Sequence, residues 1–121
     1  MTAKAKLLIV DDQPANIRVM AEALRDDYEL FFATSGERAL EIVAAGSVEL
    51  VLLDVVMPGV DGWQMLQRMQ ERYGSIPVIM FSGQVDEGSA SDAERRGARG
   101  FIGKPFDPQQ LIERAKQLVP A

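Results

Sequence analysis

The 121-residue chain contains neither histidine nor cysteine. The absence of histidine excludes Ser-His-Asp and Cys-His catalysis and every imidazole metal ligand. The absence of cysteine excludes disulfides, thiol nucleophiles and thiolate metal sites, and it fits a reducing compartment. Any chemistry must therefore come from carboxylates, lysine and hydroxyl groups.

Long apolar runs and basic clusters are also missing. The longest apolar runs have the length of β-strands, well short of the ~20 residues needed to cross a bilayer, and the first residues lack the apolar core of a signal peptide. The net charge is −5 and the Lys and Arg residues are scattered, which disfavours direct nucleic-acid binding. We therefore expect a cytoplasmic protein without membrane or nucleic-acid partners.

The composition suits one globular domain. The chain is 47% hydrophobic and 26% charged, the proportions of an ordinary folded protein, and it has no low-complexity tract or linker. We expect a single domain over residues 1–121, with a core from about residue 6 to residue 119.

Five short apolar segments alternate with segments of helical spacing. The expected strands are residues 6–10, 28–33, 49–54, 76–82 and 100–103. Helical spacing is weakest at residues 89–96, where we expect a short, marginally packed helix. The alternation predicts an α/β fold of the flavodoxin-like (βα)5 type, a doubly wound five-stranded parallel sheet in the order 2-1-3-4-5.

Polar side chains stand at the carboxyl ends of the predicted strands, the edge where open α/β sheets bind ligands. Asp11 and Asp12 follow the first strand, and Asp54 ends the third, which is its neighbour in this strand order. Ser82 ends the fourth strand and Lys104 follows the fifth. All of these groups should therefore meet at one rim of the sheet.

The three aspartates would repel one another unless a cation lay between them. A hard divalent ion would reduce this repulsion. Mg²⁺ prefers oxygen ligands and is commonly held by one or two carboxylates plus phosphate oxygens, so it suits the cluster better than Ca²⁺. The sequence thus predicts a magnesium site at Asp11, Asp12 and Asp54.

Four motifs, in this order, resemble the receiver domain of bacterial two-component response regulators. They are "VDDQ" at 10–13, "LLDVVMPGVDG" at 52–62, "FSG" at 81–83 and "GKPF" at 103–106. The resemblance runs from the first strand to the last helix. It implies a phosphorylation-activated signalling switch that changes its partner-binding surface. Such a domain is no enzyme in the usual sense, because it catalyses only its own phosphorylation and dephosphorylation.

The resemblance assigns the acceptor and the metal ligands. Asp54 would accept a phosphoryl group from a phosphohistidine on a sensor histidine kinase or a histidine phosphotransfer protein. Asp11, Asp12, Asp54 and the backbone carbonyl of Val56 would bind Mg²⁺. The signal would then pass to an output partner or a fused output domain whose identity the sequence leaves open.

The resemblance also assigns the groups around the phosphoryl oxygens. Ser82 and Lys104 would each hold one of these oxygens, and Ser82 with Phe101 would form the conformational switch. Val56 and Gln84, two residues beyond Asp54 and Ser82, occupy positions that tune phosphoryl lifetime. We expect Val56 to shield the aspartyl phosphate from attacking water.

Simpler explanations stay open for individual residues. Asp12 could cap the helix that begins near Pro14, and Ser82 could be an ordinary turn residue. Lys104 could be a solvated charge, and Phe101 could be a plain core side chain.

Two other functions also stay open. One is a Mg-dependent phosphohydrolase with an aspartate nucleophile, although such enzymes typically carry a second acid two residues on, where this chain has Val56. The other is a phosphorylation-independent interaction module.

Overall fold

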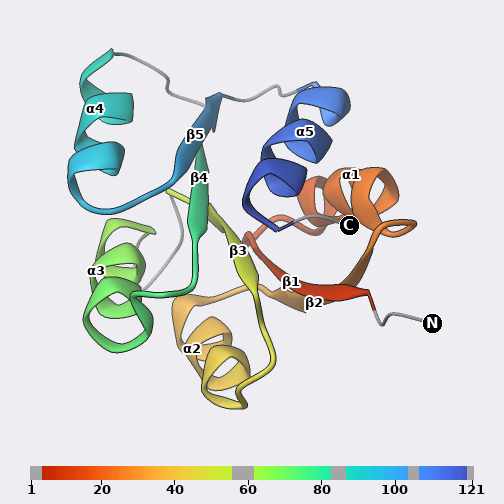
Figure 1. Cartoon of the computed structure of the whole chain (residues 1–121), viewed down its shortest axis with the longest axis horizontal. Helices are drawn as coiled ribbons and strands as arrows, with labels where there is room; N and C mark the ends of the chain where they lie inside the picture. The colour runs from red at the N-terminus through yellow and green to blue at the C-terminus, as the bar shows by residue number, and fades with distance from the viewer. Residues whose placement is uncertain (1–3, 56–61, 83–86, 104–106, 120–121) are drawn as a thin grey trace.

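The computed structural model describes residues 4–55, 62–82, 87–103 and 107–119. Strands and helices alternate along the described chain (Figure 1). They are β1 (Ala5–Val10), α1 (Pro14–Leu24), β2 (Tyr28–Ala33), α2 (Gly36–Ala44), β3 (Leu50–Asp54), α3 (Gly62–Tyr73), β4 (Val78–Ser82), α4 (Glu87–Arg95), β5 (Gly100–Gly103) and α5 (Pro108–Leu118).

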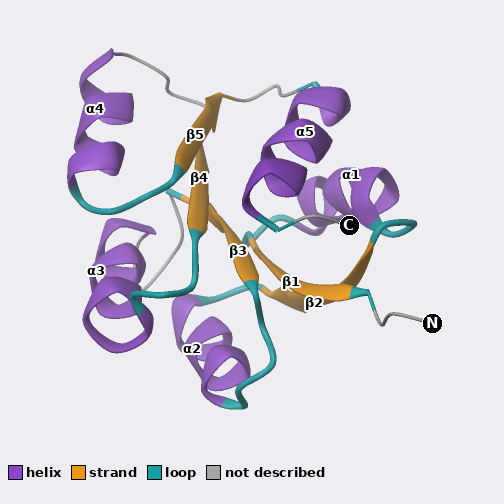
Figure 2. Ribbon diagram, viewed as in Figure 1, coloured by secondary structure: helices purple, strands orange, loops and turns teal. Residues whose placement is uncertain are grey.

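The strands form one parallel sheet in the order β2-β1-β3-β4-β5. Helices α1 and α5 cover one face, and α2, α3 and α4 cover the other (Figures 1 and 2). The predicted fold class and strand order are therefore confirmed.

The strands are apolar throughout because both of their faces are covered. In β1, Leu7 and Ile9 belong to the core layer beneath α1 and α5, whereas Leu8 and Val10 belong to the layer beneath α2, α3 and α4. All four side chains are completely buried. This two-sided burial explains why the strands appear in the sequence as continuous apolar runs.

The register of the strands brings the predicted polar residues to one rim. Val10 pairs with Leu53, so Asp11 and Asp54 both stand one residue beyond the same pair. The next pairs across the sheet match Asp54 with Phe81 and Ser82 with Gly103. The carboxyl ends of β1, β3 and β4 therefore place their polar side chains at the same edge.

Helix α1 begins at Pro14, with Gln13 in the N-cap position. Proline suits this first helical position because its fixed φ angle is already helical and the missing N–H would have had no helical partner. The cap is therefore Gln13 and not Asp12, which corrects the capping alternative for Asp12.

Helix α4 is weakly anchored, as the sequence pattern predicts. Within its described side chains, residues 91–95, Ala93 is the buried apolar one, and Ala98 follows in the next turn. Two methyl groups bury far less apolar surface than a leucine or methionine would. The position of α4 must therefore depend on other contacts.

The helices are short compared with the thickness of a bilayer. The 12 residues of α3 span about 18 Å. In the part of the chain that the structure describes, no helix is both long enough and apolar enough to cross a membrane.

Candidate functional site

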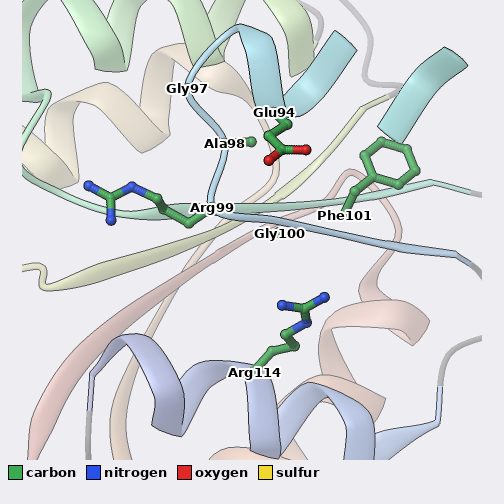
Figure 3. Close-up of a pocket in the computed structure, with 7 residues that line it drawn as sticks. All are labelled: Glu94, Gly97, Ala98, Arg99, Gly100, Phe101 and Arg114. Carbon is green, nitrogen blue, oxygen red and sulfur yellow. The ribbon is translucent and has the colours of Figure 1, made fainter. Parts of the chain in front are cut away.

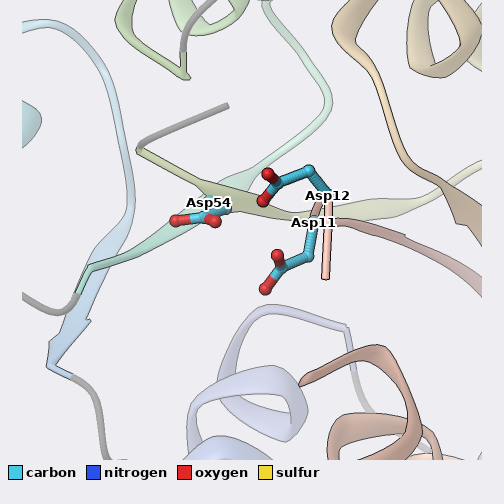
Figure 4. A group of neighbouring side chains, drawn as sticks. All are labelled: Asp11, Asp12 and Asp54. Carbon is cyan, nitrogen blue, oxygen red and sulfur yellow. The ribbon is translucent and has the colours of Figure 1, made fainter. Parts of the chain in front are cut away.

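Three aspartate side chains converge at the carboxyl edge of the sheet (Figure 4). Asp54 comes from the end of β3, and Asp11 and Asp12 come from the residues directly after β1. One carboxylate oxygen from each lies within 4.8 Å of the others. This donor set consists only of oxygen, which fits a hard divalent cation such as Mg²⁺.

The aspartates differ in exposure. Asp11 is 0% exposed and Asp54 is 4% exposed, whereas Asp12 is half-buried. A buried carboxylate is costly unless hydrogen bonds or opposite charge compensate for its lost hydration. The Asp11 carboxylate accepts a hydrogen bond of 2.9 Å from the backbone N–H of Gln13. A cation placed among the three groups would also reduce their mutual repulsion.

Ser82 reaches the same edge from β4. Its side chain is 4% exposed, and its strand lies beside that of Asp54. Ser82 pairs with Gly103, the residue that directly precedes Lys104 in the sequence. The register therefore brings the predicted hydroxyl residue to the rim at which Asp54 stands.

Three predicted site residues, Lys104, Val56 and Gln84, lie outside the described residues. Lys104 is predicted to bind a phosphoryl oxygen. Val56 is predicted to supply a metal-binding carbonyl and a shielding side chain, and Gln84 to influence phosphoryl lifetime. These roles stay predictions.

Phe101 lies in β5 and is half-buried. Its ring packs against the core layer beneath α2, α3 and α4, so it contributes to packing as the simpler explanation expects. It also borders a cavity of about 480 Å³, shown in Figure 3. The residues that line this cavity are Glu94, Gly97, Ala98, Arg99, Gly100, Phe101 and Arg114.

Gly62 is a site residue to which the sequence pattern assigned no role. Its N–H donates a 2.8 Å hydrogen bond to the carbonyl of Val55. A Cβ atom at this position would lie 2.3 Å from the carbonyl oxygen of Asp54 and 2.5 Å from the Cα of Val55. Only glycine fits this close approach. The available signals were its place at the end of the motif at 52–62 and its position at the start of a helix, where the low helical propensity of glycine requires a reason.

Gln13 is a second residue that the sequence pattern did not assign to the site. Its contribution comes from its backbone N–H, which donates to Asp11, and not from its side chain. Any residue except proline supplies that donor. Residue type therefore carries no signal for this contact.

The family model described as the response regulator receiver domain matches residues 7–116. Sporulation initiation phosphotransferase F of Bacillus subtilis is 34% identical over 117 residues, covering 95% of this chain and 94% of that protein. Transcriptional regulatory protein ResD of Bacillus subtilis is 30% identical over 119 residues. That match covers 98% of this chain but 49% of ResD, so the chain spans about half the length of this relative.

Solved structures show the same architecture. The crystal structure of a putative response regulator from Chloroflexus aurantiacus superposes with a TM-score of 0.90 at 30% sequence identity. The superposition covers 98% of this chain and 99% of that one. The similarity therefore extends over the whole sheet and the helices on both of its faces.

Proposed function

Because the chain belongs to the response regulator receiver family, whose members act as phosphorylation-dependent switches in two-component systems, we propose that Asp54 is its phosphoryl acceptor. The observation that carries this proposal is the position of Asp54. It ends a buried strand, is 4% exposed, and has a carboxylate oxygen within 4.8 Å of oxygens from both Asp11 and Asp12. The donor would be a phosphohistidine on a sensor histidine kinase or a histidine phosphotransfer protein.

Receiver domains generally bind Mg²⁺ at an acidic pocket, and the aspartate cluster fits that ion. In our proposal, Asp11, Asp12, Asp54 and the backbone carbonyl of Val56 hold the metal. When bound, Mg²⁺ would neutralise charge on the transferring phosphoryl oxygens. Asp11 also orients the first turn after β1, because its carboxylate accepts the Gln13 N–H.

The remaining groups act on the phosphoryl oxygens. Phosphoryl transfer depends mainly on positioning and charge neutralisation, so a hydroxyl and an ammonium beside the acceptor are suitable partners. Ser82 supplies the hydroxyl and Lys104 the ammonium in this proposal. Val56 slows hydrolysis of the aspartyl phosphate by shielding it from water, whereas the Gln84 amide orients water and acts in the opposite direction.

Phosphorylation would alter the surface formed by α4, β5 and α5. A phosphoryl group shifts a conformational equilibrium only through contacts that differ between the two states. The contacts that Ser82 and Lys104 make with phosphoryl oxygens are of this kind. Phe101 connects them to the surface as the second switch residue. Figure 3 shows charged side chains from both flanking helices directed toward β5, with Glu94 coming from α4 and Arg114 from α5. These charges offer polar contacts to a partner.

The wider role of the protein is a further part of the proposal. The signal passes either to a separate output partner or to a fused output domain. The chain covers 94% of the length of sporulation initiation phosphotransferase F but 49% of that of ResD. The chain itself acts as a switch. It catalyses its own phosphorylation and dephosphorylation and turns over no external substrate. The cytoplasmic location stays a prediction.

The test is phosphorylation by a small donor. Purified protein is incubated with acetyl phosphate and Mg²⁺, and its intact mass is measured. We expect one added phosphoryl group in the wild type and in Asp26→Asn, a matched variant at an exposed aspartate, and none in Asp54→Asn. A modification that persists in Asp54→Asn would contradict the proposal.

The same samples separate the two rival functions. Sustained hydrolysis of small phosphate esters would support a phosphohydrolase. A wild-type chain that gains no mass under any of these conditions, yet still binds its partner, would support a phosphorylation-independent interaction module.

A further inference from the structure

The C-terminal end of α4 is attached to α3 by long side chains. The guanidinium carbon of Arg96 lies 4.8 Å from the centre of the Trp63 ring, which is a cation–π contact. The side-chain amide of Gln70 donates a hydrogen bond of 3.5 Å to the carbonyl of Gly97. Both contacts join α3 to the residues directly after α4.

The turn after α4 has the shape that these contacts require. The N–H of Gly97 donates to the carbonyl of Glu94 and the N–H of Ala98 to that of Ala93, at 3.1 and 2.9 Å, which is a Schellman helix end. Gly97 has a φ of +102°, and a Cβ there would lie 2.5 Å from the Gln70 side chain. Glycine is therefore needed both for the backbone conformation and for the approach of Gln70.

Apolar packing contributes little at this helix end. The buried side chains here are the small ones of Ala93 and Ala98. A hollow of about 420 Å³ is lined by Gln67, Gln70 and Glu71 of α3 and by Arg96. Between α3 and this helix end, the structure therefore describes the cation–π contact of Arg96 and the hydrogen bond of Gln70 alongside the packing of small side chains.

These contacts also connect α4 to the acceptor strand. Helix α4 lies in the sequence between Ser82 and Phe101, the two proposed switch residues. Helix α3 begins at Gly62, which rests directly against the backbone of Asp54 and Val55. The Trp63, Gln70 and Arg96 contacts therefore give α4 a second connection to the end of β3, independent of Ser82.

We propose that Trp63, Gln70 and Arg96 form a latch that resists displacement of α4 from α3 and so opposes switching. This inference rests on the proposed function, in which phosphorylation of Asp54 shifts the surface that includes α4. Contacts made in the present arrangement stabilise it relative to any arrangement in which α4 has moved. Loss of the latch should therefore make both local opening of this turn and phosphorylation easier.

The first measurement is hydrogen exchange of the unmodified protein, followed by mass spectrometry over residues 93–99. Arg96→Gln removes the cation from Trp63, and we expect exchange in this segment to become about two- to fivefold faster, the range that an exposed cation–π contact supports. Arg95→Gln is the matched control, because Arg95 is exposed, pairs with Asp92 of its own helix, and carries the same charge. Gln70→Ala should act in the same direction as Arg96→Gln. Equal exchange in Arg96→Gln and Arg95→Gln would overturn the latch.

The second measurement is the rate at which acetyl phosphate and Mg²⁺ add a phosphoryl group, followed by intact mass. We expect Arg96→Gln to react about two- to fivefold faster than the wild type and Arg95→Gln. Faster exchange with an unchanged or lower phosphorylation rate would overturn the link to switching. A wild type that gains no phosphoryl group would instead count against the proposed function, which keeps the two failures distinct.

Discussion

At the scale of single residues, Gly62 tests how strictly the acceptor strand is positioned. In Gly62→Ala the new methyl group would overlap the carbonyl of Asp54, because the Cβ would lie 2.3 Å from its oxygen. The end of β3 must then shift, and a misplacement of about 1 Å can cost about 100-fold in rate. We expect phosphoryl incorporation from acetyl phosphate to fall about tenfold or more, measured by intact mass over time.

Gly100→Ala is the control for this substitution. A Cβ at Gly100 would lie 3.6 Å from the Ile79 side chain, an ordinary contact distance. Its rate of phosphoryl incorporation should stay close to that of the wild type. If the Gly62 and Gly100 variants react equally fast, Gly62 has no positioning role.

We expect Tyr28 to make the stability of the fold depend on pH in the alkaline range. Its side chain is 2% exposed, and its hydroxyl donates a 2.6 Å hydrogen bond to the carbonyl of Val119. Burial raises the pKa of Tyr28 above 10.0, and the charge of Asp27 adds to this effect. The folded state thus disfavours the ionised phenol. The stability from this group is fully present below pH 10.0 and is lost as the pH rises through the folded-state pKa.

Urea unfolding between neutral and strongly alkaline pH measures this effect. Tyr28→Phe should cost about 1 kcal/mol of unfolding free energy at pH 7 through loss of the hydrogen bond. It should also remove part of the decline of the unfolding free energy at alkaline pH. An identical pH profile in wild type and Tyr28→Phe would contradict the assignment.

At the scale of secondary-structure elements, Ser35 is a helix cap with a measurable contribution. Its side-chain oxygen accepts a 3.2 Å hydrogen bond from the N–H of Arg38 at the start of α2. Ser35→Ala should lower the unfolding free energy by about 1 kcal/mol in urea denaturation. Ser47→Ala, at an exposed loop position, should change it by less than about 0.5 kcal/mol. Equal effects of the two substitutions would rule out capping by Ser35.

The strands and the start of α1 could be predicted from the sequence to within two residues. Two-sided burial leaves a continuous apolar run, so the predicted strand at 28–33 coincides with β2 and the strand at 6–10 differs from β1 by one residue. The start of α1 at Pro14 confirms the predicted start near this proline, which suits the first helical position although the first apolar-periodic residue, Ile17, comes three residues later.

The candidate site was predictable where it depends on strand order. Asp11 and Asp54 meet because each follows the Val10–Leu53 pair, and a parallel sheet in this order requires that. The contact between Trp63 and Arg96 was not predictable, because it depends on how closely α3 and the end of α4 approach each other on the same face of the sheet (Figure 1). Periodicity identifies each helix but not the distance between two of them.

At the scale of the whole molecule, metal binding should stabilise the fold. An ion that binds only the folded chain raises its stability by about 2.7 kcal/mol when its free concentration is 100 times Kd. We therefore expect Mg²⁺ to raise the thermal midpoint in calorimetry and EDTA to reverse the rise. Asp12→Asn should weaken this response, whereas Asp26→Asn should retain it. A midpoint insensitive to Mg²⁺ in the wild type would argue against the site.

The hydrogen bond between Tyr28 and Val119 also fixes the position of the C-terminal end of α5. Tyr28 is the first residue of β2, so the end of α5 is held at the amino-terminal edge of the sheet. The three aspartates stand at the opposite, carboxyl-terminal edge. An affinity tag or reporter protein attached after α5 would therefore emerge remote from the acceptor, which makes this end suitable for tethering the protein to a surface while a kinase approaches Asp54.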